Sequence, residues 1–267
     1  MVTDVAPAPI RLVLESLQAQ GRYTFTTREA ADAAPRSEAA LAASLRRLKR
    51  QRRIVSPRRG FYVIVPPEYR VAGSPPASWF IDDLMRFLRQ PYYVGVLSAA
   101  AIHGAAHQQP QVFQVMTDRP TRPARAGRVD VVFHVGRPLE RRPTELKQTD
   151  TGTMVVATPE TTAFDLVHYP AVAGHLNNVA TVLRDLAERL DARALVGLAG
   201  VYAVSDVQRL GYLLEQGGRS DLAEPLAEWL ASRRVRPVVI APGEPRGEAS
   251  PDPRWRVTLN EPIEVDL

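Results

Sequence analysis

Two histidines have the spacing of a helical metal site. His103 and His107 lie four residues apart, which places two imidazoles on one face of a helix. No glutamate lies between them and no third ligand is evident, so packing or hydrogen bonding is the more common role of such a pair. The chain has no cysteine, which excludes disulfides, thiolate zinc sites, iron–sulfur clusters and cysteine nucleophiles. We therefore expect no metal site.

Two aspartates are the other candidates for chemistry. Asp130 stands alone on a predicted strand, whereas a metal-dependent nucleotidyltransferase needs at least two closely spaced acids to hold Mg²⁺. Asp165 interrupts an apolar helical pattern, and we expect it to anchor a neighbouring helix end or loop. The sequence has no Gly-x-Ser-x-Gly, P-loop or Gly-x-Gly-x-x-Gly motif. We expect no catalytic residue, no cofactor and no enzymatic activity.

The positive charge is concentrated near the start of the chain. The formal net charge is +5, and residues 1–70 hold 13 of the 34 Lys and Arg side chains but only six of the 29 acids. This asymmetry indicates that one segment meets a polyanion. The proline-rich stretch 65–76 is typical of a semi-rigid linker, because proline fixes φ and removes amide donors. We predict two domains, 1–73 and 74–267.

The segment before the linker has the pattern of a winged helix–turn–helix domain. Apolar residues recur at helical spacing, Thr26 with Glu29 forms a capping box, and Ser37 is a cap for the last helix. We predict a helix over Ile10–Gln20, a short helix that begins at Thr26 or Thr27, and a longer helix over Glu38–Arg52. Two strands follow, Arg53–Val55 and Phe61–Val65, and the turn Ser56–Gly60 joins them. In such a domain the third helix enters the major groove and the wing contacts the backbone or minor groove.

The predicted third helix has one buried and one basic face. If Leu41, with Leu45 and Leu48, points to the core, Ala43, Arg47 and Arg50 point away from it. Small side chains between guanidinium groups let a helix approach a groove closely. The predicted DNA contacts are Thr26, Thr27, Arg36, Ser37, Ala40, Ala43, Arg46, Arg47, Arg50, Arg58 and Arg59. The alternatives are a solvated basic helix end and a protein-docking module.

In the larger segment, predicted strands are followed by a run of predicted helices, which favours an α+β domain. We predict an amphipathic helix at Trp79–Leu88, a buried stretch at Tyr92–Ala106 and strands over Val112–Met116, Arg128–Val135, Met154–Ala157, Arg236–Ile240 and Trp255–Leu259. The predicted helices are Thr162–His168, Leu176–Arg189, Ala192–Val201, Ser205–Gln216 and Asp221–Ala231. Seven arginines between residues 119 and 142 suggest a second phosphate-contacting surface with Arg119, Arg122, Arg125 and Arg128. A solvated loop is the alternative.

Several segments resemble the AbiEi family of abortive-infection antitoxins, which belong to type IV toxin–antitoxin systems. The most specific is Pro91–Gln108, PYYVGVLSAAAIHGAAHQ. The other segments are Arg59–Val63, Thr158–Leu166, Gln208–Glu215, and Arg254–Trp255 with Asn260, Ile263–Glu264 and Asp266. The resemblance covers nearly the whole chain.

The resemblance implies an autorepressing antitoxin. Family members bind inverted repeats in their own promoter through the winged helix, and the C-terminal domain carries antitoxin activity and supports cooperative DNA binding. The cognate toxin is nucleotidyltransferase-like and is countered directly or indirectly. No catalytic residue is implied, and the first residues lack a signal-peptide pattern, so we expect a cytoplasmic protein. The alternatives are a protein-docking inhibitor that does not bind DNA and an enzyme with a hidden metal or nucleotide site.

Overall fold

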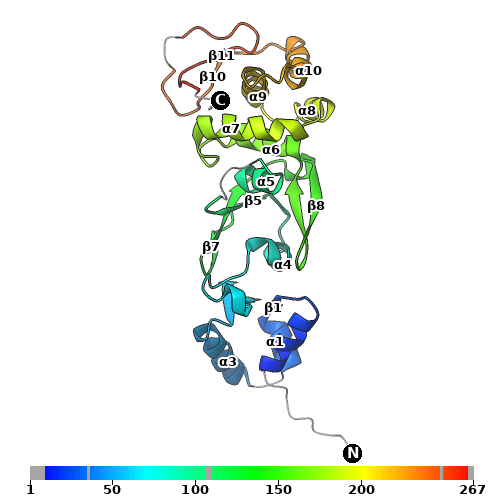
Figure 1. Ribbon diagram of the computed structural model, residues 1–267, viewed down its shortest axis with the longest axis vertical. Coiled ribbons are helices and arrows are strands. Elements are labelled where there is room, and N and C mark those ends of the chain that lie inside the picture. The colour runs from blue at the N-terminus through cyan, green and yellow to red at the C-terminus, as the bar shows by residue number, and fades with distance from the viewer. Residues whose placement is uncertain (1–9, 35–36, 106–109, 247–248, 264–267) are drawn as a thin grey trace, which may run out of the picture.

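The elements form an elongated molecule in the computed structural model, which describes residues 10–34, 37–105, 110–246 and 249–263. The first helix, α1 (Ile10–Ala19), lies near one end, and the helices that precede the C-terminus lie at the other (Figure 1). In these ranges helices are combined with three sheets, so the predicted α+β class is confirmed. Within the described ranges, no helix is long and apolar enough to cross a membrane.

The N-terminal part contains three helices and a three-stranded antiparallel sheet with the order β1-β3-β2. After α1 its elements are β1 (Thr24–Thr26), α2 (Thr27–Ala33), α3 (Glu38–Arg50), β2 (Ile54–Arg58) and β3 (Phe61–Ile64). All predicted helices and both predicted strands of this part are present. Strand β1 was not predicted, because its three residues are held by pairing with β3, which is distant in the sequence.

Local contacts set the ends of these helices. Thr26 Oγ1 accepts a hydrogen bond from the Glu29 amide at 3.2 Å, and Glu29 accepts one from the Thr26 amide at 2.7 Å, so the predicted capping box is present. Ser37 caps α3, as predicted. Helix α3 ends at Arg50 and not at Arg52, because Arg52 adopts a left-handed conformation with a φ of 53°.

Two hydrophobic cores meet along β3. The predicted stripe Leu41, Leu45 and Leu48 is buried in the N-terminal core. That core also contains Ile10, Leu14, Phe25, Ala30, Ile54, Tyr62 and Ile64. Phe61 and Val63, the other two residues of β3, belong to the core of the larger part. Alternate side chains of one strand therefore fasten the two parts together.

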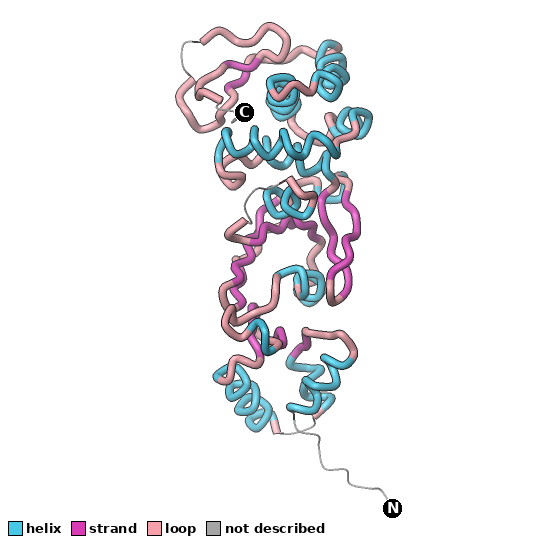
Figure 2. Tube along the Cα trace, viewed as in Figure 1, coloured by secondary structure: helices cyan, strands magenta, loops and turns pink. Residues whose placement is uncertain are grey.

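The larger part is built on a six-stranded mixed sheet in the order β6-β7-β5-β4-β9-β8. Strands β5 and β7 run parallel, as do β4 and β9, and the other neighbours are antiparallel. The strands are β4 (Tyr92–Val94), β5 (Phe113–Thr117), β6 (Ala124–Ala126), β7 (Val129–Val135), β8 (Thr144–Thr149) and β9 (Gly152–Ala157). Figure 2 shows them curving around helix α4 (Ile81–Leu88). The stretch predicted as one buried unit, Tyr92–Ala106, is divided into β4 and helix α5 (Val96–Ile102).

Helices cover the end of this sheet and extend beyond it (Figure 1). Helix α6 (Pro159–His168) packs on α5 and on three later helices, α7 (His175–Leu186), α8 (Ala192–Leu198) and α9 (Val204–Gln216). Helix α10 (Ser220–Ala231) packs on α8 and α9. The last two strands, β10 (Val238–Val239) and β11 (Val257–Thr258), form a parallel pair and are shorter than predicted. The remaining short elements are 3₁₀ turns at Pro67–Tyr69, Ala77–Trp79, Leu139–Arg141 and Ala187–Arg189.

Candidate nucleic-acid interface

The outward face of α3 is basic and flanked by small side chains. Leu41, Ser44, Leu45 and Leu48 are buried, so the opposite side of the helix faces solvent. Its exposed basic residues are Arg46, Arg47, Lys49 and Arg50, and the small residues Ala39 and Ala43 are exposed nearer its start. The face derived from the 100° turn per residue therefore agrees with the structure.

These cations have no carboxylate partner among the described residues, whereas other arginines of the same part are paired. Arg22 contacts Glu29 at 2.6 Å, and Arg11 contacts Glu15 at 3.2 Å. No ion pair joins an acid of the described ranges to Arg46, Arg47 or Arg50. These guanidinium groups are free to meet an external anion.

The predicted DNA contacts that lie before or at the start of α3 differ in their exposure and hydrogen bonding. Arg36 lies outside the described residues. The Thr26 and Ser37 hydroxyls accept hydrogen bonds within their own caps, at Glu29 and Ala40. Thr27 is exposed and Ala40 is partly exposed. The two threonines therefore begin α2 and Ser37 begins α3, which carries the basic face, and their contact with DNA stays a prediction.

Arg58 is directed toward the larger part of the protein. Its Nη1 donates to the carbonyl of Pro123 at 2.9 Å, and its Nη2 donates to the carbonyl of Arg122. The guanidinium also lies 5.8 Å from the centre of the Phe133 ring. Arg59, the next residue, is exposed. Arg58 thus joins β2 to the arginine-rich stretch, while Arg59 is left at the tip of the hairpin.

The arginine-rich stretch is more ordered than a solvated loop. It contains β6 and β7. Arg119, Arg122, Arg125 and Arg128 are exposed, and Arg125 lies 3.5 Å from Asp130. Because Arg58 binds carbonyls of this stretch, the stretch lies next to the β2–β3 hairpin. Its contact with phosphate stays a prediction.

A buried polar cluster lies between the sheet and the helices. Arg142, also from the arginine-rich stretch, is 5% exposed, and its Nη1 donates to Asp165 Oδ1 at 2.9 Å. Tyr93 donates its hydroxyl to Asp165 Oδ2 and Tyr202 to Oδ1, each at 2.9 Å. Arg142 also donates to the Tyr93 hydroxyl at 2.9 Å and lies 4.6 Å from the centre of the Tyr202 ring. Asp165 therefore anchors a neighbouring segment, as expected from its place in an apolar helix.

Burial sets the protonation of this cluster. It raises the pKa of the Tyr93 and Tyr202 hydroxyls well above their ordinary value, so both remain donors at neutral pH. Burial also raises the pKa of Asp165, and this effect is opposed by the charge of Arg142 and by the two hydroxyls. Although burial acts to lower the pKa of Arg142, the charge of Asp165 raises it overall. Asp165 and Arg142 thus form an ion pair inside the core, in which the Arg142 Nε has no hydrogen-bond partner among the described residues.

Of the two histidines of the metal hypothesis, His103 lies just after a helix and not within it. Helix α5 ends at Ile102, and His103 follows as its C-cap. His103 Nε2 donates to the carbonyl of Ala157 at 2.8 Å, and burial lowers the pKa of the imidazole. His107 lies outside the described residues. In the described ranges no group of three or more His, Asp or Glu side chains could hold a metal ion.

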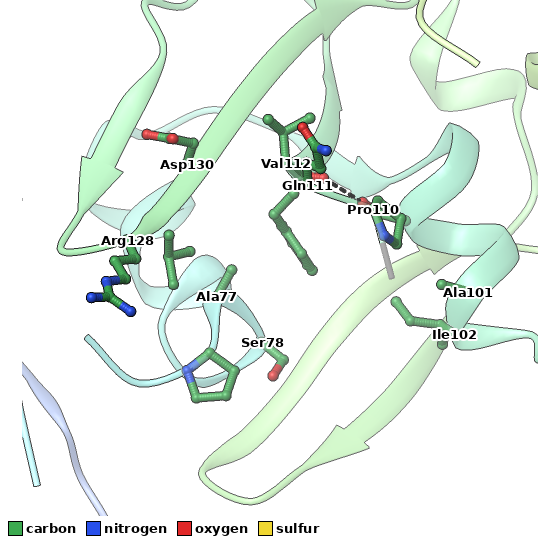
Figure 3. A pocket seen from close by; sticks show the side chains of 13 residues that line it. Ala77, Ser78, Ala101, Ile102, Pro110, Gln111, Val112, Arg128 and Asp130 are labelled. Atoms are coloured by element: carbon green, nitrogen blue, oxygen red, sulfur yellow. Dashed lines mark hydrogen bonds between the residues drawn. The ribbon is translucent and has the colours of Figure 1, made fainter. Parts of the chain in front are cut away.

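A pocket of about 470 Å³ lies between the 3₁₀ turn Ala77–Trp79, helix α5 and the start of β7 (Figure 3). Its lining is largely apolar, and Arg128 and Asp130 stand on one side of it (Figure 3). Asp130 has no second acid in this lining, and its nearest charged partner is Arg125. The described residues that line the pocket include no pair of acids for a metal and no nucleophile next to a base.

The comparison with known families decides what the larger part is. Residues 93–216 match the sequence model of a family described as the AbiEi antitoxin C-terminal domain. This chain carries an AbiEi antitoxin domain. The match supports an antitoxin role, and antitoxins in general act against a toxin. No curated protein matches the chain.

The fold also has a solved counterpart. The chain is similar to the crystal structure of the RV2827C protein from Mycobacterium tuberculosis, with a TM-score of 0.67 and 20% sequence identity. The similarity covers 95% of this chain and 92% of that one. At this identity the likeness concerns the fold alone. Because it covers 95% of this chain, the likeness in fold includes both the N-terminal part and the larger part.

The AbiEi-like segments meet in space at two places. Tyr93 and Asp165, from two of these segments, meet in the buried polar cluster. Gln208 donates to the Trp255 carbonyl at 2.8 Å, and Trp255 Nε1 donates to Glu215 at 2.6 Å, which joins the segments Gln208–Glu215 and Arg254–Trp255. Sequence reasoning missed Arg142 in the cluster, because it was counted with an exposed arginine-rich stretch. The signal that could have found it was Asp165 itself, since a buried carboxylate needs a cationic or hydrogen-bonding partner.

Proposed function

We propose that this chain is a DNA-binding antitoxin that represses its own operon. Residues 1–73 act as a winged helix–turn–helix domain, and residues 74–267 carry the AbiEi antitoxin function. Helix α3 enters the major groove of operator inverted repeats, and Arg59 at the hairpin tip contacts the backbone or minor groove. The protein acts as a regulator in the cytoplasm and not as an enzyme. Its partner is a nucleotidyltransferase-like toxin, countered directly or indirectly.

The observation that carries the proposal is the basic face of α3. Three exposed arginines lie beside small alanines, and none of the three has an internal carboxylate among the described residues. A helix with this surface can approach a groove closely while its guanidinium groups reach phosphates or base edges. The capping box of α2 and the Ser37 cap of α3 support the same motif, because they fix where each helix begins.

The larger part extends the proposed DNA surface. Arg58 holds carbonyls of Arg122 and Pro123, so the exposed arginines of that stretch lie beside the hairpin. We assign Arg119, Arg122, Arg125 and Arg128 to contacts with phosphates that flank the half-site. Arg58 then acts by positioning this surface, and Arg59 is the wing residue that reaches DNA.

Replacing Arg47 and Arg50 together by alanine is expected to weaken operator binding by roughly 10- to 100-fold, the loss typical of one or two specific arginine contacts. The measurement is a titration of full-length protein against a duplex carrying the region upstream of its own gene, with an unrelated duplex of equal length alongside. Circular dichroism of the variant should match the wild type, because both side chains are exposed.

The matched control replaces Arg193 and Arg234, two exposed arginines of the C-terminal helical part, and removes the same net charge. Its affinity should stay within about twofold of the wild type, because these side chains lie far from the proposed interface. Equal losses in the two double variants would show a general charge effect, and an unchanged affinity of the Arg47/Arg50 variant would contradict docking through α3.

Replacing Arg122 and Arg125 by alanine should weaken binding to operator and unrelated DNA about equally, because phosphate contacts carry no sequence information. The slope of log affinity against log salt concentration should fall by up to about two, one for each lost phosphate contact. The check is binding at several salt concentrations. A selective loss on the operator, or an unaltered slope, would remove this stretch from the interface.

A further inference from the structure

In the part of the chain that the structure describes, no strand pairs with the outer edge of β8 (Thr144–Thr149). Strand β8 pairs with β9 on one side and is the last strand of the sheet order. Figure 1 shows it on the outer side of the sheet. The opposite edge, β6, lies against β2 of the N-terminal part. An edge strand presents unpaired backbone donors and acceptors, so β8 can accept another strand.

The side chains of β8 alternate in a self-complementary order. Its sequence is Thr-Glu-Leu-Lys-Gln-Thr over Thr144–Thr149. Leu146, in the middle of the strand, is 70% exposed. Glu145 and Lys147 lie on the opposite face from Leu146, and their side chains form an ion pair of 2.8 Å. The charges thus stand symmetrically on either side of an exposed apolar residue.

We propose that two copies of the chain associate by antiparallel pairing of β8 about a two-fold axis through Leu146. In this register each Leu146 lies opposite its equivalent in the second copy. Glu145 of one copy lies opposite Lys147 of the other, and Thr144 lies opposite Gln148. Directly opposed side chains of unlike charge stabilise an antiparallel pair, whereas like charges destabilise it. The pairing therefore joins four charges of alternating sign on one face and covers two leucines on the other.

The expected dimer is weak. One strand from each copy buries far less than the area of about 1,200 Å² that marks the lower limit of stable interfaces. Association should therefore appear at high protein concentration, or where two copies are held close together. The inference does not depend on DNA binding, because β8 belongs to the AbiEi domain and not to the N-terminal part.

The chain contains no cysteine, which allows a direct test of the register. Residues opposite each other in an antiparallel pair have Cα atoms about 4.5 or 5.5 Å apart, within the range that a disulfide spans. Full-length Leu146→Cys is expected to form a disulfide-linked dimer under mild oxidation. Val71→Cys, at a side chain that is 77% exposed, controls for random collision. Gln148→Cys controls for the register, because its equivalent lies four residues away along the paired strand.

We expect Leu146→Cys to cross-link at least about tenfold faster than either control, the difference expected between a preformed pair and random collision. A mixture of Thr144→Cys and Gln148→Cys proteins should cross-link faster than either alone. Equal rates for Leu146→Cys and Val71→Cys would overturn the proposal. Faster cross-linking of Gln148→Cys than of Leu146→Cys would overturn the register through Leu146.

Charge reversal provides an independent test without a thiol. Lys147→Glu places like charges opposite each other twice in the dimer, and is expected to weaken association by roughly tenfold in sedimentation velocity. Lys147→Glu combined with Glu145→Lys again places unlike charges opposite each other and has the net charge of the wild type. This double variant should therefore restore association. Arg234→Glu, an exposed reversal outside β8, should leave association unaltered. A wild type that stays monomeric at several hundred micromolar, or a double variant no better than Lys147→Glu, would overturn the proposal.

Discussion

Replacing Asp165 by alanine is expected to destabilise the fold by about 3–5 kcal/mol, the usual cost of removing one partner of a buried ion pair. Asp165 is fully buried and accepts three hydrogen bonds, from Arg142, Tyr93 and Tyr202. Without it the Arg142 guanidinium would remain inside the core with its charge unpaired, the Tyr93 hydroxyl would lose its acceptor, and the Tyr202 hydroxyl would keep only the Thr161 carbonyl at 3.4 Å. Urea unfolding followed by circular dichroism measures the loss.

The control for this variant is Asp130→Ala, which removes an aspartate whose ion pair with Arg125 is exposed. Exposed pairs contribute about 0–1 kcal/mol, so its unfolding midpoint should stay close to that of the wild type. A double variant tests whether the cost comes from leaving one buried charge without its partner. Replacing Asp165 by leucine and Arg142 by methionine removes both charges, and should cost less than the sum of the single changes. Additive costs, or a loss below about 1 kcal/mol in Asp165→Ala, would show that the pair does not couple as the contacts indicate.

The sequence was most informative where a structural feature depends on neighbours within one or two turns. The capping box at Thr26 and the cap at Ser37 were predictable, because the residues that form each cap lie three positions apart. The buried and basic faces of α3 followed from the helical repeat alone. The anchoring role of Asp165 was predictable, because a carboxylate in an apolar helix requires a partner. The sequence did not show which residue that partner is.

Features that depend on distant residues could not be predicted in this way. Strand β8 is a polar sequence that is a strand because it pairs with β9, and β1 is a strand because it pairs with β3. Arg58 was grouped with Arg59 because they are adjacent, yet carbonyls more than sixty residues away hold only Arg58. Arg142 was grouped with exposed arginines, because its partners Tyr93 and Asp165 are not visible from its own segment.

The largest expected effect outside the polar cluster concerns the contact between α9 and the C-terminal segment. Trp255 is fully buried, its Nε1 donates to Glu215 at 2.6 Å, and its ring lies directly over Gly211 of α9. A Cβ added at Gly211 would overlap that ring. Gly211→Ala is therefore expected to displace Trp255 and to cost about 3–5 kcal/mol, similar to removing the ring in Trp255→Ala.

The two changes should not add, because both act on the same contact. Once Trp255→Ala has removed the ring, a methyl group at position 211 meets open space, and alanine is about 1 kcal/mol better than glycine in a helix. Gly211→Ala is thus expected to change from strongly destabilising in the wild type to neutral or stabilising in the Trp255→Ala background. Gly197→Ala is the matched control, since nothing lies within 4 Å of the position its Cβ would occupy in α8, and it should stabilise the wild type slightly. Thermal and urea unfolding of the four combinations measures the coupling. Equal costs of Gly211→Ala in both backgrounds would mean that the glycine is required for a reason other than the close approach of Trp255.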